Sequence, residues 1–265
     1  MSVELQDLEA FLVDMDGVLY RGDTTLPGAR AFLEHLQDRR IPHVFLTNNS
    51  SRTPQQYVEV LGRMGVRVSP DRILTSALVT AADVARMAAE DARILMVGSH
   101  GLREALTAAG LTLTERADNA AFVVVGLDRN VTYEKLAQAS LAIERGARFL
   151  GTNADGSFPS ERGLEPGTGA LLAAIEAASG VRPQVYGKPE PAMFEQALEL
   201  LGSARERTAM IGDRHETDIV GAARVGLVTI AVTTGAGSTE ELRRLEPPPD
   251  FVFPSVLEIH QALAG

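Results

Sequence analysis

The stretch Phe11-Leu12-Val13-Asp14-Met15-Asp16-Gly17 decides the fold. Three apolar residues precede the first carboxylate, which predicts a buried β-strand that ends at Asp14. Side chains two residues apart in extended backbone point to the same side, so Asp14 and Asp16 could both project beyond the strand end. Neighbouring carboxylates repel each other and are costly to desolvate, and a hard divalent cation relieves both costs. Taken alone, the stretch is equally consistent with a solvated turn that closes a strand.

The composition bounds the class of protein. The 265 residues suffice for one large domain or two modest ones, and 45% hydrophobic with 23% charged residues is ordinary for a globular chain. A formal net charge of −10 argues against a general affinity for nucleic acid or anionic membranes. Cysteine is absent, which excludes disulfides, thiolate metal sites and a cysteine nucleophile.

The N-terminal residues and the apolar runs predict where the protein works. Residues 1–7 lack the basic and apolar regions of a signal peptide, and no apolar run approaches the length of a membrane span. The lack of cysteine fits a reducing compartment. We therefore expect a cytoplasmic protein that binds neither membranes nor nucleic acid.

Strand-like and helix-like segments alternate along the whole chain. This alternation predicts an α/β fold with a mostly parallel sheet. The middle of the chain repeats the alternation by itself, so we expect a second domain inserted into the first. The expected division is a core of residues 1–79 and 181–265 with an insert of residues 80–180.

Several predicted strands end in polar side chains. In open parallel sheets, ligands bind in the crevice outside the carboxyl ends of the strands. Each cluster alone could be an ordinary helix cap. It is much less expected that all of the clusters fall at strand ends by chance. The residues are Asp14 and Asp16; Thr47, Asn48 and Asn49; and Asp213 and Asp218.

Four segments in this order resemble the motifs of the haloacid dehalogenase (HAD)-like hydrolases. They are Asp14-Met15-Asp16-Gly17-Val18-Leu19-Tyr20, Thr47-Asn48-Asn49, Gly187-Lys188-Pro189 and Gly212-Asp213-Arg214-X-X-Thr217-Asp218. The insert resembles the C2-type cap of that family. Thr152-Asn153-X-Asp155 followed by Pro166-Gly167-Thr168-Gly169-Ala170 resembles subfamily IIA, the branch of NagD-like and para-nitrophenylphosphatase-like phosphatases. The resemblance implies a Rossmann-like parallel-sheet core with an inserted α/β cap.

The resemblance also implies a mechanism. Asp14 would attack phosphorus to form an aspartyl-phosphate, and Asp16 would protonate the leaving group and then activate water. Mg²⁺ would be held by the Asp14 carboxylate, the Asp16 main-chain carbonyl and Asp213. Asp218 would orient Lys188 or a metal-bound water. The phosphate-binding residues would be Thr47, Asn48, Asn49 and Lys188.

The substrate specificity would come from the cap. We expect contacts from the loop of residues 153–162, with Asn153 and Phe158 as candidates and an apolar or aromatic leaving group stacked on Phe158. His215, between Asp213 and Asp218, is a candidate for the mouth of the site. An apolar face of the cap could support a homodimer.

The expected function is a Mg²⁺-dependent phosphatase that hydrolyses phosphomonoesters of small metabolites. A phosphoryl transferase could use the same intermediate with another acceptor. A receiver-like domain, phosphorylated on Asp14 as a signal, has no need of an insert of this size. A non-catalytic phosphate-binding module would not need the full set of acidic and basic groups. The sequence does not name the phosphoester.

Overall fold

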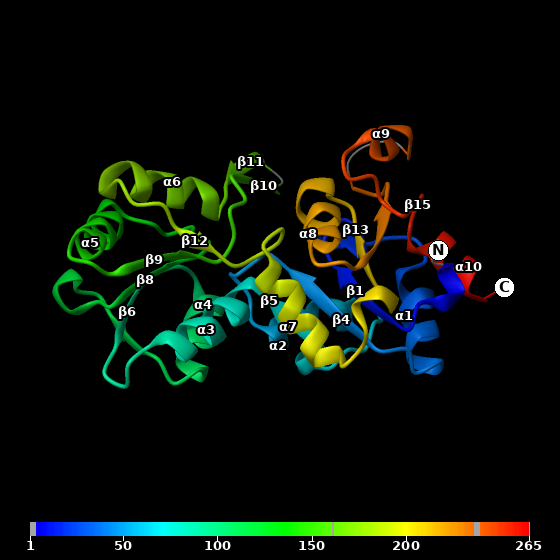
Figure 1. Cartoon of the computed structure of the whole chain (residues 1–265), viewed down its shortest axis with the longest axis horizontal. Helices are drawn as coiled ribbons and strands as arrows, with labels where there is room; N and C mark the ends of the chain where they lie inside the picture. Colours follow the sequence, from blue (N-terminus) through cyan, green and yellow to red (C-terminus); the bar gives the residue numbers. More distant parts are fainter. Residues whose placement is uncertain (1–3, 161, 236–238, 265) are drawn as a thin grey trace. The chain divides into compact units, whose positions relative to one another are not determined.

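The computed structural model describes residues 4–160, 162–235 and 239–264. The chain divides into two compact units, coloured along the chain in Figure 1. The first unit comprises Met1–Thr47, Pro54–Leu74 and Lys188–Gly265, and the second comprises Asn48–Thr53 and Thr75–Gly187.

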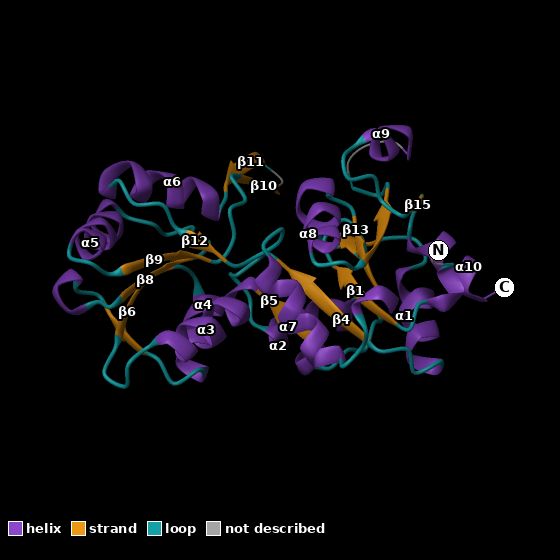
Figure 2. Cartoon of the chain, viewed as in Figure 1, coloured by secondary structure: helices purple, strands orange, loops and turns teal. Residues whose placement is uncertain are grey.

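A six-stranded sheet organises the first unit (Figure 2). Its spatial order is β15-β14-β13-β1-β4-β5. Counted in chain order within this unit, that arrangement is 3-2-1-4-5-6 read from the other edge, which is the order of Rossmann folds. The strands are β1 (Ala10–Asp14), β4 (His43–Thr47), β5 (Ile73–Thr75), β13 (Thr208–Gly212), β14 (Val228–Val232) and β15 (Phe251–Phe253).

Strand β1 is central because both of its faces are covered. All five of its residues are buried. Phe11 and Val13 belong to a core cluster with Phe32, Tyr57 and Ile259 from the helices on one face of the sheet. A strand buried on both faces needs a continuous apolar run rather than alternation, and Ala10–Val13 supplies it.

Helices and single turns complete the described part of the first unit. Helix α1 begins at Ala29, and the residue before it, Gly28, has a φ of +78°. The helices are α1 (Ala29–Asp38), α2 (Pro54–Arg63), α7 (Pro191–Leu201), α8 (Val220–Arg224), α9 (Thr239–Arg244) and α10 (Val256–Ala264). A π-helical turn, η5 (His215–Ile219), precedes α8, and the 3₁₀ turns are η1 (Leu5–Asp7), η2 (Pro70–Arg72) and η4 (Arg205–Arg207).

The second unit contains a five-stranded sheet of its own, in the order β12-β9-β8-β6-β7. All four strand pairs in it are parallel. The strands are β6 (Arg93–Val97), β7 (Thr112–Thr114), β8 (Phe122–Val125), β9 (Arg148–Gly151) and β12 (Gln184–Val185). The helices are α3 (Ser76–Met87), α4 (His100–Ala108), α5 (Tyr133–Glu144) and α6 (Thr168–Ser179), with a 3₁₀ turn η3 (Ala117–Asn119). The predicted α/β class with parallel sheets is therefore confirmed.

The short elements had no signal in the sequence. Strands of two or three residues carry too few positions to show a periodicity. This applies to the hairpin of β2 (Tyr20–Arg21) and β3 (Thr24–Thr25), and to β5, β7 and β12. The expected loop of residues 153–162 instead contains β10 (Ser157–Ser160), which pairs antiparallel with β11 (Gly163–Pro166); residue 161 lies outside the described residues. Within the described ranges, none of the helices combines the length and apolarity needed to cross a bilayer.

Candidate active site

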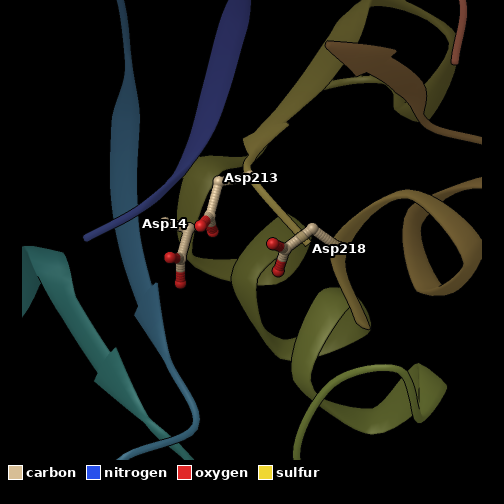
Figure 3. A group of neighbouring side chains, drawn as sticks. All are labelled: Asp14, Asp213 and Asp218. Carbon is tan, nitrogen blue, oxygen red and sulfur yellow. The ribbon is translucent and has the colours of Figure 1, made fainter. Parts of the chain in front are cut away.

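Three buried carboxylates converge at the carboxyl edge of the first sheet (Figure 3). Asp14 ends β1, Asp213 follows β13, and Asp218 lies in η5. One carboxylate oxygen from each lies within 4.8 Å of the others. Strands β1 and β13 are neighbours, and the strand order reverses between them, which is where doubly wound sheets open a ligand-binding crevice.

Lys188 neutralises part of this charge. Its side chain is 3% exposed, and its Nζ donates to the carboxylate of Asp14 and lies 2.6 Å from Oδ1 of Asp218. The residue immediately precedes Pro189, and α7 begins at Pro191. One ammonium against three carboxylates leaves the cluster with a net negative charge when all four groups are ionised.

Burial and mutual repulsion shift the titration of these groups. Desolvation, followed by the charge of Asp218, raises the pKa of Asp213 to about 7, although Lys188 opposes the shift. Burial also raises the pKa of Asp14, again against Lys188. Burial alone would lower the pKa of Lys188, but the charges of Asp14 and Asp218 outweigh it and raise that pKa, so the ammonium stays protonated.

The donor set of the cluster fits a hard divalent cation. Oδ1 of Asp213 is buried and makes no hydrogen bond with any described residue, which is costly for a carboxylate oxygen unless a further ligand satisfies it. Oxygen ligands of this kind suit Mg²⁺ or Ca²⁺. The acidic cluster could therefore bind a metal ion, with Asp213 offering the oxygen that this ion would satisfy.

The raised pKa of Asp213 predicts a pH dependence of the metal-free protein. The folded protein holds a proton on Asp213 up to about pH 7, whereas the unfolded chain releases it near the ordinary value of 3.8. This preference stabilises the fold at low pH and is lost as the pH rises through about 7. In EDTA, we expect the free energy of unfolding to fall by about 1 kcal/mol from this group between pH 6 and pH 8.

Urea unfolding at the two pH values tests this dependence. Asp213→Asn should show a clearly smaller fall than the wild type. Asp91→Asn, a change at an exposed position of the second unit, is the control and should keep the wild-type slope. Equal slopes in wild type and Asp213→Asn would contradict the assignment.

Two glycines allow the backbone to pass against Asp213. Gly17 has a φ of +86°, and a Cβ there would lie 2.2 Å from Oδ2 of Asp213; a Cβ on Gly235 would lie 1.8 Å from the same oxygen. Thr234 ties the two segments together, because its hydroxyl donates to the carbonyl of Gly17 over 2.5 Å. The Arg21 guanidinium adds a hydrogen bond of 3.3 Å to the carbonyl of Gly235. The loop after β14 therefore closes one side of the carboxylate cluster.

We expect Gly17→Ala to weaken metal binding. The new methyl group would displace Asp213 and strain the positive φ, so Mg²⁺ affinity should fall about 10-fold or more. Gly22→Ala is a matched control, since Gly22 also has a positive φ (+57°) but a Cβ there would meet no atom of the described residues within 4 Å. Calorimetric titration with Mg²⁺ measures both variants, and equal affinities would show that the contact with Asp213 is unimportant.

The remaining candidates from the first unit lie at the same sheet edge. Asp16 is exposed, in the turn beyond β1, and its charge contributes to the raised pKa of Asp213. Thr47 is buried at the end of β4, and its neighbour Leu46 pairs with Asp14 across the sheet. The side chains of Asp14 and Asp16 do not follow the regular alternation of a β-strand, because β1 ends at Asp14 and Asp16 lies in the turn beyond it.

The candidates in the second unit form hydrogen bonds there. The amide nitrogen of Asn153 donates to the carbonyl of Asn48 over 2.7 Å and to Oγ1 of Thr168 over 3.2 Å. The side chain of Asn49 accepts two hydrogen bonds from Ser51, as in an Asx turn. These contacts give the three asparagines a structural role within that unit.

Phe158 lies in β10, half-buried, and carries a cation–π contact. The guanidinium carbon of Arg129 lies 4.9 Å from the centroid of its ring. Glu165, opposite Phe158 in the hairpin, forms ion pairs with Arg162 at 2.5 Å and with Arg129 at 3.9 Å. The aromatic ring is therefore part of a charged cluster on the hairpin.

Sequence reasoning missed Thr234 and Gly235. Their segment follows β14 without a motif, and only the fold places it against Gly17 and Asp213. His215 is buried, and its Nε2 lies 2.9 Å from the carbonyl oxygen of Pro247.

Comparisons with known proteins identify the family of the chain. The family model described as haloacid dehalogenase-like hydrolase matches residues 11–112, and a second, described as HAD-hydrolase-like, matches residues 185–259. An acid sugar phosphatase from Staphylococcus epidermidis (strain ATCC 12228) is 41% identical over 249 residues, which cover 94% of this chain and 95% of that protein.

Solved structures show the same fold over nearly the whole chain. The 4-nitrophenylphosphatase of Thermotoga maritima has a TM-score of 0.91 at 38% identity, covering 98% of each chain. NagD from Escherichia coli K-12 has a TM-score of 0.88 at 35% identity, covering 95% of this chain and 98% of NagD. The chain therefore belongs to the haloacid dehalogenase-like hydrolases, in the branch of the NagD-like and p-nitrophenylphosphatase-like phosphatases.

Proposed function

We propose that the protein is a Mg²⁺-dependent phosphatase that hydrolyses phosphomonoesters of small metabolites through a phosphorylated Asp14. The single observation that carries the proposal is the position of Asp14. It lies at the strand-order reversal of the sheet, held by Lys188 beside Asp213, whose Oδ1 has no hydrogen-bond partner among the described residues. The names of the phosphatases reported above support this class of reaction.

Asp14 is the proposed nucleophile. Its contact with Lys188 holds one carboxylate oxygen, so that the other can be directed at a phosphorus atom. Lys188 is kept charged by Asp14 and Asp218, so it can also offset the negative charge of a phosphate. Asp218, with Oδ1 at 2.6 Å from Nζ, positions this lysine.

Asp16 is the proposed general acid and base. It is exposed, in the turn beyond β1. A group that exchanges protons with a leaving group and with water must be accessible in this way. Thr47, buried at the end of β4, would donate its hydroxyl to a phosphate oxygen, with the main chain of Asn48 and Asn49 following it.

Asp14, Asp213 and the main-chain carbonyl of Asp16 would hold Mg²⁺. The ion would supply positive charge that screens the attacking carboxylate from the phosphate. Asp213 is poised for this role, since its carboxylate loses its proton near pH 7 and carries the buried oxygen described above.

The second unit is the proposed cap, for which the sequence predicted residues 80–180. It would select the leaving group. The hairpin around Phe158 would contribute to this selection directly, and Asn153 would contribute less directly. The relatives named for sugar phosphates and for 4-nitrophenyl phosphate suggest small phosphoesters as substrates. The absence of cysteine fits a cytoplasmic location.

Phosphate release from p-nitrophenyl phosphate and from a panel of sugar phosphates tests the proposal. Activity should require Mg²⁺ and disappear in EDTA. Added acceptor alcohols should leave the ratio of phosphate to nitrophenol at one. A ratio below one, with formation of a new phosphoester, would instead identify a phosphoryl transferase. The absence of Mg²⁺-dependent release from every phosphoester in the panel would count against the proposal.

A further inference from the structure

His215 connects η5 (His215–Ile219), called the acidic turn here because it contains Glu216 and Asp218, to another part of the first unit. Its side chain is 7% exposed, and its Nε2 lies 2.9 Å from the carbonyl oxygen of Pro247. A carbonyl oxygen can only accept, so Nε2 carries the hydrogen and the imidazole is the donor.

The turn that begins at His215 carries Asp218. The turn is closed by two hydrogen bonds: the amide of Asp218 donates to the carbonyl of Arg214 over 2.9 Å, and the amide of Arg214 donates to Oδ2 of Asp218 over 3.1 Å. The other carboxylate oxygen of Asp218 lies 2.6 Å from Nζ of Lys188, which in turn contacts Asp14. Any tilt of the turn would therefore be passed to the lysine and to Asp14.

The segment that accepts the hydrogen bond is itself anchored to the sheet. Pro247 lies between α9 and β15 (Figure 1), three residues before Asp250. The carboxylate of Asp250 accepts from the amide and the hydroxyl of Thr229 in β14, each over 2.8 Å, and its own amide donates to that hydroxyl over 2.9 Å. The segment that contains Pro247 is thus tied to β14 at Asp250.

We propose that His215 is a positioning residue, which holds the acidic turn by its hydrogen bond to Pro247 so that Asp218 and Asp213 keep their places beside Lys188 and the metal. This inference rests on the proposed function. A π-helical turn includes a wider backbone loop than an α-helix and often occurs at functional sites. Here η5 is joined to α8 at one end, and His215 secures the end next to Asp213.

Two substitutions separate a hydrogen-bond anchor from a space-filling side chain. His215→Phe keeps a ring of similar size and removes the donor, whereas His215→Gln loses the ring and keeps an N–H near the same place. We expect His215→Phe to lower kcat about 10-fold and to raise the Mg²⁺ concentration for half-maximal activity about 10-fold, with KM for p-nitrophenyl phosphate little changed. His215→Gln should stay within about threefold of wild type in all three, as the conservative rescue.

Asp250→Ala tests the same connection from its other end. It releases the segment of Pro247 without touching His215, so it should raise the Mg²⁺ requirement in the same direction. Because both changes break one chain of contacts, the double variant with His215→Phe should be little worse than either single variant. Additive losses would show that the two residues act independently and would overturn the proposal.

The circular dichroism spectrum and melting temperature accompany each kinetic measurement. The proposal would be overturned if His215→Phe kept the wild-type kcat and Mg²⁺ requirement. It would also be overturned if His215→Gln and His215→Phe, both folded, lost activity equally. If the phenylalanine variant does not fold, His215→Met replaces it, and a loss in His215→Gln alone still counts against the proposal. Failure of the proposed function would be a different result, because the wild type itself would then lack activity. In that case, the rise in melting temperature on adding Mg²⁺ would still compare metal binding among the same variants.

Discussion

Asp14→Asn is expected to abolish Mg²⁺-dependent phosphate release, with a loss of about 10⁴-fold or more in kcat. The amide keeps the size of the side chain and can still accept a hydrogen bond from Lys188. It is, however, far too weak a nucleophile to displace the leaving group from phosphorus. Steady-state kinetics with p-nitrophenyl phosphate, in Mg²⁺ and in EDTA, measure the loss.

The stability of Asp14→Asn distinguishes a lost nucleophile from a lost fold. Asp14 lies among buried carboxylates, and its burial raises its pKa, so the charge is costly in the metal-free protein. Replacing it by an amide removes one of the negative charges that pair with Lys188 but also removes repulsion from Asp213 and Asp218. We expect the melting temperature in EDTA to be close to that of the wild type. A folded Asp14→Asn protein with wild-type activity would remove Asp14 as the nucleophile.

Asp16→Asn is expected to separate the two halves of the reaction. p-Nitrophenolate leaves without needing a proton, so transfer of its phosphate to Asp14 should continue. Hydrolysis of the phosphorylated Asp14 needs a base to activate water, and this step should slow by about 10²–10⁴-fold. The result is a burst of about one nitrophenol per enzyme, followed by a slow phase. A sugar phosphate, whose alkoxide must be protonated, should show no burst.

Rapid mixing with p-nitrophenyl phosphate measures the burst, and labelled phosphate on the quenched protein identifies the intermediate. The double variant Asp14→Asn with Asp16→Asn is the control and should show neither burst nor label. Asp16 is exposed, so its replacement should leave the melting temperature unchanged. Equal activity of Asp16→Asn and wild type on a sugar phosphate would exclude Asp16 as the proton donor.

The sequence by itself determined the elements with a local signal. The run Ala10–Val13 is apolar throughout because β1 is buried on both faces, and it ends where Asp14 begins the site. Helices such as α1 and α7 carry apolar residues at helical spacing, and this periodicity is a property of neighbouring residues. The order of the four motifs identified the family, and the comparisons confirmed it.

The tertiary structure decided which distant groups meet. Asp14 and Asp213 are close because β1 and β13 are neighbours in the sheet, and no local pattern encodes that pairing. Asp218 contacts Lys188 because η5 turns it back toward the sheet edge. Gly235 lies against Asp213 although its loop has no motif.

The structure also shows hydrogen-bond partners that no local pattern indicates. Asn153 matched a family motif, yet its amide forms hydrogen bonds with Asn48 and Thr168 inside the second unit. His215 was a candidate for the mouth of the site, and the structure places its Nε2 beside the carbonyl of Pro247. The physical reason is that local sequence sets backbone conformation within a few residues, whereas burial, pKa shifts and hydrogen-bond partners depend on which strands and loops the fold brings together.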